Sequence, residues 1–508
     1  MKTIFPKTVY LPVITLIFAL SYTAHVDAQP VLTEQSISMG GGGSYLTGPA
    51  ANFYNPANLM IRDQARRNRI ILGQGGFFLS EGIGTKNLMQ NYRDFANYFT
   101  SYNALETGQS DAETLDRRFP TNSDIFANTA RYDVLAFGIS FTRNENAYSL
   151  ALRSRSTNTY EINQSWFDNS FETTEDGDTH VRTLRHNLKT YHELSFGFAR
   201  EVSMVNGWIP GLSKLYFGIA PKLVIGGMFF DGDYSSTYFN DPVEGTLQHT
   251  SQYVARSVAR NTNTYVSNPA SPPVAKIADQ PLVKPQSILK NTGIGMGLDF
   301  GLTYIKSLDG DNSLAPGSAD PLRKSLRFSI SMTDIGFVSY KEQPSVFQIV
   351  TDTVNIGSKP QKAERHYAGQ IGEFTSFISN YSEVTDSPES STSVTGQFNR
   401  KLPAALHLGS ALQYHRFLAA VDLEYQISPV RSDYKGWHTR FGTELRLLKF
   451  LPLRAGVSLT PSMKPTLGLG AGIDTGFWEL SVATQLKRGI NNEIYTVGLA
   501  VAALQFRF

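Results

Sequence analysis

Nine charged residues could bind a polar substrate or carry protons, because all of them occupy the polar positions of segments in which apolar and polar residues alternate. They are Arg153, Arg155, Arg327, Asp422, Glu424, Glu444, Arg446, Arg454 and Glu479. Charged groups in an interior need partners of opposite sign. The set mixes both signs, and we therefore interpret it as inward-facing charges that pair across neighbouring strands. We assign no catalytic role to them.

Other patterns that could perform chemistry are incomplete. The glycine run 40–43 is not followed by Gly-Lys-Ser/Thr, so it is not a phosphate-binding loop. Gly293, Gly295, Gly297 and Gly301 suggest dinucleotide binding only superficially, because they alternate with apolar residues and are better interpreted as small inward-facing residues of a strand. The chain has no cysteine, which excludes disulfides and thiolate chemistry. We expect no enzymatic activity, no cofactor and no metal site.

The charged residues lie on segments that read as strands. Between Phe417 and Ile427 every second residue is apolar, whereas Asp422 and Glu424 occupy the other face. This period of two is typical of a strand with one apolar and one polar face. The same pattern predicts fourteen strands, near residues 69–79, 131–142, 147–156, 188–201, 214–229, 291–306, 324–340, 403–414, 415–428, 437–448, 450–460, 464–474, 476–487 and 494–508.

The connections between these strands differ in length according to their side. The long polar stretches 80–130, 157–187, 230–290 and 341–402 all fall on one side, and mostly short turns fall on the other. Long extracellular loops and short periplasmic turns are typical of outer-membrane barrels with an even number of strands. We predict an all-β fold, a transmembrane antiparallel β-barrel of about 14 strands over residues 69–508, with both termini in the periplasm.

The last strand ends the chain on an aromatic residue. Phe506 and Phe508 share one face with Ala500, and we expect this face to contact outer-membrane lipid. The two phenylalanines would serve as the C-terminal signal for the barrel assembly machinery. The opposite face carries Val497, Leu499 and Val501, so we expect an apolar patch in the upper lumen beside the closing seam.

Two segments precede the barrel. Residues 1–28 combine Lys2 and Lys7 with an apolar stretch and small residues before position 29, which predicts a secretory signal peptide. Residues 29–68 contain Gly40, Gly41, Gly42 and Gly43, then Asn55-Pro56-Ala57, in which Asn55 can cap a helical turn that starts at Pro56. Glycines permit close backbone approach. We expect this stretch to be a hatch inside the barrel lumen.

The order of these features resembles a known superfamily. A secretion signal, a glycine-rich segment, the motif Phe53-Tyr54-Asn55-Pro56-Ala57 and a long barrel are similar to FadL-type outer-membrane transporters and the related PorV-like proteins of type IX secretion, closest to an uncharacterised family of that group. The resemblance implies that Asn55, Pro56 and Ala57 belong to an amino-terminal hatch in a barrel of fourteen strands. Asn58 replaces the glycine that usually follows this motif.

The resemblance leaves several functions open. It implies a channel for small hydrophobic or amphipathic compounds; the alternatives are a PorV-like partner in secretion or surface attachment, and a structural barrel whose loops bind exported protein. The charged inner face speaks against a fatty acid as the substrate. A formal net charge of +2 gives no reason to expect nucleic acid as a partner. A continuous apolar tunnel would favour transport, and a lumen closed by paired charges would favour a binding role.

Overall fold

The computed structural model describes residues 33–61, 68–83, 125–143, 145–163, 179–202, 213–241, 243, 246–258, 291–308, 324–340, 345–350, 354–358, 398–427, 437–460, 463–488 and 494–508. The predicted signal peptide and much of the predicted extracellular connections lie outside these residues. Within the described part, no helix has the length and apolar character needed to cross a membrane.

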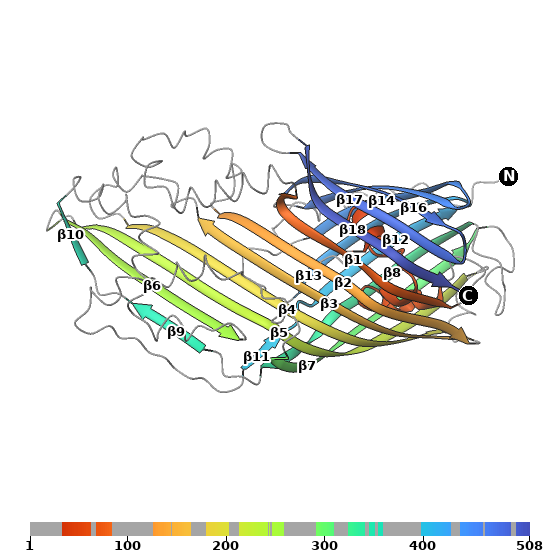
Figure 1. Ribbon diagram of the computed structural model, residues 1–508, viewed down its shortest axis with the longest axis horizontal. Helices are drawn as coiled ribbons and strands as arrows, with labels where there is room; N and C mark the ends of the chain where they lie inside the picture. The colour runs from red at the N-terminus through yellow and green to blue at the C-terminus, as the bar shows by residue number, and fades with distance from the viewer. Residues whose placement is uncertain are drawn as a thin grey trace, which may run out of the picture.

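Fourteen antiparallel strands close into a barrel, which confirms the predicted fold (Figure 1). Closure results because the first strand pairs with the second on one side and with the last on the other. Around the barrel the strands are β1 (Arg69–Ile83), β2 (Ile125–Arg143), β3 (Asn146–Asn163), β4 (Thr179–Glu201), β5 (Ser213–Asp241), β7 (Gly293–Ser307), β8 (Lys324–Tyr340), β12 (Ala405–Tyr414), β13 (Phe417–Gln426), β14 (Trp437–Leu448), β15 (Leu451–Thr460), β16 (Met463–Asp474), β17 (Trp478–Arg488) and β18 (Ile494–Arg507).

Alternation along the strands sorts side chains between the two faces of the barrel wall. In β7 the residues Gly293, Gly295, Gly297 and Gly301 are buried on the inner face, and the apolar residues between them point outward. Large apolar side chains on many strands are exposed on the outer face, for example Phe196, which is 50% exposed. A closed barrel with an apolar exterior is the form in which strands cross a membrane, because no backbone hydrogen bond is left unpaired.

Several strands are longer than the sequence predicts. β5 continues to Asp241 and pairs there with β6 (Thr246–Val258), so residues 230–290 are not wholly a loop as predicted. β3 and β4 likewise extend into 157–187, and β1 and β2 into 80–130. β9 (Ser345–Val350), β10 (Val354–Ser358) and β11 (Phe398–Lys401) lie within 341–402. The extensions of β3, β4 and β5 and the strand β6, which lie toward the left of Figure 1, are mostly polar, so they lack the apolar alternation that reveals a strand.

The prediction of which β18 residues face outward and which face inward is correct only at the C-terminal end of the strand. Phe508 is exposed on the outer face, but Leu499 and Val501 are exposed as well, and Ala500 and Ala502 are buried. The prediction that Leu499 and Val501 line the lumen is therefore wrong, whereas Val497 of the same predicted patch is buried beside Ile37 of the N-terminal segment. The register with β17 shifts by one residue at this point, where Glu479 pairs with Gln505 and Ser481 pairs with Ala502. Such a bulge exchanges the two faces of a strand.

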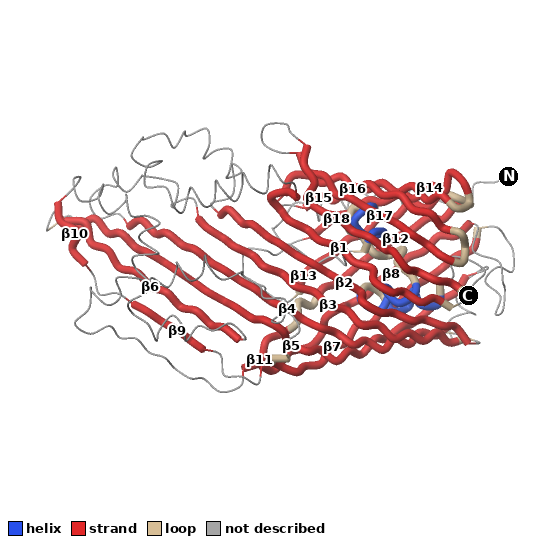
Figure 2. The backbone as a smooth tube through the Cα atoms, viewed as in Figure 1, coloured by secondary structure: helices blue, strands red, loops and turns tan. Residues whose placement is uncertain are grey.

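The N-terminal segment, residues 33–61, lies inside the ring of strands (Figure 2). It consists of the helix α2 (Glu34–Ser38) and the 3-10 helices η1 (Gly48–Phe53) and η2 (Pro56–Met60). Thr33 caps α2 by accepting from the Ser36 amide at 3.0 Å, and Asn55 caps η2 by accepting from the Ala57 amide at 3.1 Å. α2 packs against β16–β18, whereas η1 and η2 pack against β2–β5 and β7.

Candidate functional site

The N-terminal segment is held by one buried carboxylate of the wall. Asp422 on β13 accepts hydrogen bonds from the Ser44 amide and from the Tyr54 hydroxyl, both at 2.9 Å. Burial and the adjacent carboxylate raise the pKa of Tyr54, so its hydroxyl stays protonated and donates. The sequence predicts a cross-strand ion pair for Asp422, but in the structure this carboxylate binds the N-terminal segment.

A second anchor joins η2 to β7 and β8. The Asn55 side-chain amide donates to Thr303 Oγ1 at 3.0 Å, and Thr303 donates to Asn58 Oδ1 at 2.7 Å. Ser331 donates to the Tyr54 carbonyl at 2.6 Å. All of these groups are buried and uncharged. Hydrogen bonds between neutral groups contribute about 1 kcal/mol each, so this anchor is weaker than an ionic one.

Glycines let the segment and the wall approach closely. Gly40 has φ +78°, and a Cβ at this position would lie 2.6 Å from the Val457 carbonyl oxygen of β15. A Cβ on Gly42 would lie 2.2 Å from the Asp422 carboxylate. On the wall, Gly218 and Gly456 face the segment at similarly short range. The glycine run thus fits the segment into the lumen, where no larger residue could be placed. Ala57, in the same motif, is fully buried next to Gly218.

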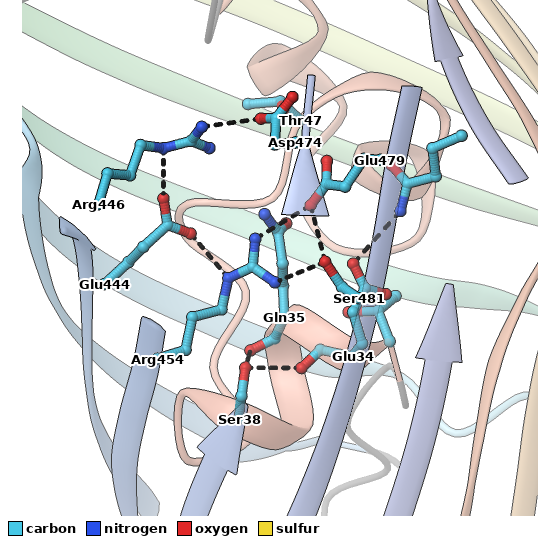
Figure 3. Close-up of polar contacts among 12 residues, drawn as sticks. Glu34, Gln35, Ser38, Thr47, Glu444, Arg446, Arg454, Asp474, Glu479 and Ser481 are labelled. Carbon is cyan, nitrogen blue, oxygen red and sulfur yellow. Dashed lines mark hydrogen bonds and ion pairs between the residues drawn. The ribbon is translucent and has the colours of Figure 1, made fainter. Parts of the chain in front are cut away.

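Six charged side chains form a closed ionic ring on β14–β18, part of which is shown in Figure 3. Going round the ring, the contacts are Glu444–Arg454 (2.7 Å), Arg454–Glu479 (3.1 Å), Glu479–Arg507, Arg507–Asp474 (2.6 Å), Asp474–Arg446 (2.7 Å) and Arg446–Glu444 (2.9 Å). Three acids alternate with three arginines, so every member contacts two opposite charges and the ring is neutral.

The helix α2 approaches this ionic ring. Glu34 of α2 is buried and accepts hydrogen bonds from Gln74 at 2.6 Å and from Gln505 at 3.3 Å. Burial raises the pKa of Glu34; nearby Arg454 opposes this shift and Glu479 adds to it. The ring therefore stands beside a fourth acid that belongs to the N-terminal segment.

The opposite part of the barrel wall, formed by β2–β5, β7 and β8, carries an open ionic chain. In order of contact it runs Asp133–Arg153 (2.6 Å), Arg153–Glu193 (3.4 Å), Glu193–Arg155 (2.6 Å), Arg155–Asp334 (2.8 Å), Asp334–Lys222 (2.5 Å) and Lys222–Asp299 (2.8 Å). Four acids share three cations. Phe53 of the segment packs against the chain, with its ring centroid 4.9 Å from the Arg153 guanidinium and 5.8 Å from the Lys222 ammonium.

A third cluster lies between the ring and the chain. Glu424 on β13 pairs with Arg440 on β14 and lies 3.4 Å from His407 Nδ1. His407 Nε2 lies 2.9 Å from the Thr333 hydroxyl, and its ring centroid lies 4.3 Å from that of Tyr54. A hydroxyl, an imidazole and a carboxylate thus lie in line. We assign no catalysis to them, because the adjacent space holds about one water molecule.

An aromatic cluster closes the lumen on the loop side of the ionic chain. It comprises Tyr191, Val224, Phe229, Val338, Tyr340 and Leu402, none of which is more than 2% exposed. The Phe229 and Tyr340 rings lie 5.3 Å apart, and the Arg400 guanidinium lies 5.2 Å from the Phe229 centroid. Asp231 contacts Arg400 at 3.1 Å. The cluster is an apolar surface with one basic group at its margin.

The described residues leave little free space between these layers. One cavity of about 10 Å³ lies beside Tyr54, Arg155 and His407, and another of the same size lies beside Phe53 and Gln74. Each has room for about one water molecule. Around these two cavities, the lumen is therefore filled by the N-terminal segment and by side chains of the wall.

The nine charges predicted from the sequence all have buried or partly buried positions on the inner wall. Arg446, Arg454, Glu444 and Glu479 meet in the ionic ring, and Arg153 and Arg155 meet in the ionic chain, whereas Arg327 is buried on β8 outside both. Eight partners are missing from the predicted set: Asp133, Glu193, Lys222, Asp299, Asp334, Arg440, Asp474 and Arg507. Asp299 could have been predicted to face inward, because it is separated by an even number of positions from the inward-facing glycines of Gly293–Gly301.

Comparison with known proteins gives a family and distant structural likenesses. The model of a family of unknown function, DUF5723, matches residues 69–485. No curated protein sequence matches the chain. The chain is similar to the Pseudomonas putida toluene transporter TodX, with 13% identity, a TM-score of 0.43 and coverage of 95% of this chain and 99% of that one. It is also similar to the Ralstonia pickettii toluene transporter TbuX, with 12% identity, a TM-score of 0.41 and coverage of 97% and 100%.

Proposed function

We propose a function for this chain, which belongs to the DUF5723 family, from the geometry of its lumen. The protein is an outer-membrane barrel and acts as a FadL-like channel for small hydrophobic or amphipathic compounds. Residues 33–61 form its hatch, and displacement of the hatch opens the lumen. The barrel stands with its short turns and both termini toward the periplasm, after removal of the signal peptide.

The observation that carries this proposal is that most charges of the wall pair with one another, whereas Asp422 is bonded to the hatch. The ionic ring and the ionic chain are each formed entirely by residues of the strands. The hatch is attached mainly by neutral hydrogen bonds and by the single carboxylate of Asp422. Leaving a buried charge without its partner is costly, whereas exchanging neutral hydrogen bonds for water costs little. The hatch can therefore move without disrupting the wall.

The substrate class follows from the aromatic cluster. Tyr191, Phe229 and Tyr340 are packed against one another inside the barrel, on the loop side of the hatch, and a compound would bind by separating their rings. Arg400 lies at the margin of this surface, where it can contact a polar end of a bound compound. Apolar and aromatic walls with few polar groups are typical of sites for small organic ligands. This arrangement supports an apolar or amphipathic substrate rather than an ionic one.

Conductance tests the hatch. We expect deletion of Gly40–Leu59 to raise single-channel conductance in planar bilayers, because the deleted residues fill the lumen. Asp422→Ala should increase the frequency of open events, since it removes a wall carboxylate that accepts two hydrogen bonds from the hatch. Glu145→Ala, which changes an exposed acid in a turn, is the matched control and should leave conductance unchanged. Unchanged conductance in the deletion variant would contradict the proposal.

A second candidate, a PorV-like partner in secretion or surface attachment, is favoured by two observations. The N-terminal segment and wall side chains fill the lumen around two small cavities, and β4, β5, β6, β9 and β10 form a sheet that continues beyond the barrel (Figure 1). In this role the barrel anchors the sheet, and the sheet binds exported protein. In that case, removal of residues 231–258 would reduce the amount of exported protein at the cell surface. Deletion of Gly40–Leu59 would leave the single-channel conductance unchanged.

A further inference from the structure

We propose that the turn end of the barrel binds the headgroup of an anionic phospholipid through Lys324, Arg416 and Lys449. This inference rests on the orientation proposed above, which places the short turns at the periplasmic leaflet. It concerns the outer surface of the barrel and is independent of what passes through the lumen.

The three cations are carried by neighbouring strands. Lys324 begins β8, Arg416 lies in the turn between β12 and β13, and Lys449 lies in the turn between β14 and β15. The strands β8, β12, β13, β14 and β15 pair in this order. The register places Lys324 opposite Tyr414, and the Arg416 guanidinium donates to the Leu447 carbonyl at 3.4 Å. The three groups therefore form one basic patch across adjacent hairpins.

Exposed apolar side chains surround this patch. Tyr414 and Leu447 are 52% and 57% exposed, and Leu448 and Phe450 are exposed as well. The Lys324 ammonium lies 5.3 Å from the Tyr414 ring centroid. Aromatic and basic residues at the edge of a membrane barrel lie at the level of the lipid headgroups. A ligand here has an anionic group beside the cations and acyl chains beside the apolar side chains, which is the chemistry of an anionic phospholipid.

The charge balance of the turn end supports this partner. On the opposite side of the barrel, two cations of the turn end have acids beside them: Arg200 lies 4.0 Å from Glu145, and Lys214 lies 2.6 Å from Glu201. Within the described residues, no carboxylate pairs with Arg416 or Lys449. Glu444 and Asp474 on the neighbouring strands face inward and belong to the ionic ring. The patch thus offers positive charge to a ligand from the membrane.

Native mass spectrometry of the full chain in detergent tests the proposal. Cardiolipin and phosphatidylethanolamine are added separately, and the apparent affinity of the bound lipid is measured. One basic residue near an anionic surface contributes about fivefold in affinity. We therefore expect Arg416→Gln with Lys449→Gln to weaken cardiolipin binding about thirtyfold and to leave the weaker phosphatidylethanolamine binding unchanged. The matched control Arg200→Gln, at a cation that already has an acid, should bind cardiolipin as the wild type does.

Three outcomes would overturn the inference. They are equal affinity for the two lipids, an unchanged affinity in the double variant, and the same loss in Arg200→Gln as in the double variant. Preferred retention of lipopolysaccharide, lost in the double variant, would place the patch in the outer leaflet and contradict the orientation as well. Conductance of the hatch deletion is a separate readout, so failure here is distinguishable from failure of the proposed channel. Gel mobility without boiling shows whether each variant is folded.

Discussion

Two opposite parts of the barrel wall, which we call the two walls, pair their buried charges in different ways. On β14–β18 the ionic ring closes on itself, and each of its three acids contacts two arginines. On β2–β8 the ionic chain joins four acids and three cations, and it is open at Asp299. A ring has no end, whereas a terminal acid of a chain depends on one side-chain cation. The two walls should therefore respond differently to the loss of one cation.

The largest effect is expected at an end of the ionic chain. Lys222→Met leaves Asp299, which is fully buried, without its side-chain cation; only the Asp334 amide still donates to it. Removing one partner of a buried ion pair costs about 3–5 kcal/mol. We expect this decrease in the free energy of unfolding, measured by urea titration in detergent with gel mobility as the readout of folded barrel. A smaller decrease in the free energy of unfolding than that caused by Arg454→Met in the ionic ring would contradict the comparison.

A cation of the ionic ring should matter less. Arg454→Met removes contacts to Glu444 and Glu479, but Arg446 still holds Glu444 and Arg507 still holds Glu479. Because no acid is left alone, the cost is that of lost charged hydrogen bonds, about 2–3 kcal/mol. The same urea titration measures it. Arg200→Gln, on the exposed rim, is the control and should change the free energy of unfolding by less than about 0.5 kcal/mol.

The excess acid of the chain can be removed to sharpen the contrast. In the double variant Lys222→Met with Asp299→Asn, the buried carboxylate is gone, Arg155 still holds Asp334, and the amide at 299 can still accept from the Asp334 backbone. Neutral replacement of a buried pair costs little. We expect a free energy of unfolding within about 1 kcal/mol of the wild type. If the double variant is no more stable than Lys222→Met alone, the uncompensated charge at Asp299 is not the cause of the loss.

The contrast between the walls also shows what the sequence could predict. The alternation of apolar and polar residues located all fourteen barrel strands, because one face of each contacts lipid and the other the lumen. It did not reveal the extension of β5 to Asp241, where both faces are polar. It also misplaced Leu499 and Val501, because a one-residue bulge in β18 exchanges the faces without any change in composition.

Pairing of charges was harder to predict than their position. Arg454 and Glu479 are separated by 25 residues and Arg155 and Asp334 by 179, and only the strand order brings them together. Asp334 was not recognised, because it lies at a break in the β8 register and has φ 59°, a left-handed conformation that no period-two pattern indicates. The sequence therefore indicates which residues face inward, but the register decides which charges form a ring and which form a chain.

The smallest effect concerns the acid that stands beside the ionic ring. Glu34 of the N-terminal segment has a raised pKa because it is buried, so when it ionises it adds a fourth acid beside the three acids and three arginines of the ring. The folded protein then binds more protons than the unfolded one between the ordinary pKa of glutamate and the raised value. The free energy of unfolding must fall as pH rises through that window.

Glu34→Gln tests this by removing the titrating group. Its side chain can keep both neighbours, because the Gln74 amide can flip and present its oxygen, which has no partner in the wild type. We expect the variant to be more stable than the wild type at neutral pH and its stability to vary less between pH 4 and pH 7, in urea titrations over that range. An equal pH dependence in both proteins would mean that the arginines of the ionic ring fully compensate the charge of Glu34. The ionic ring and the ionic chain would then differ only in that the ring is closed and the chain ends at a terminal acid.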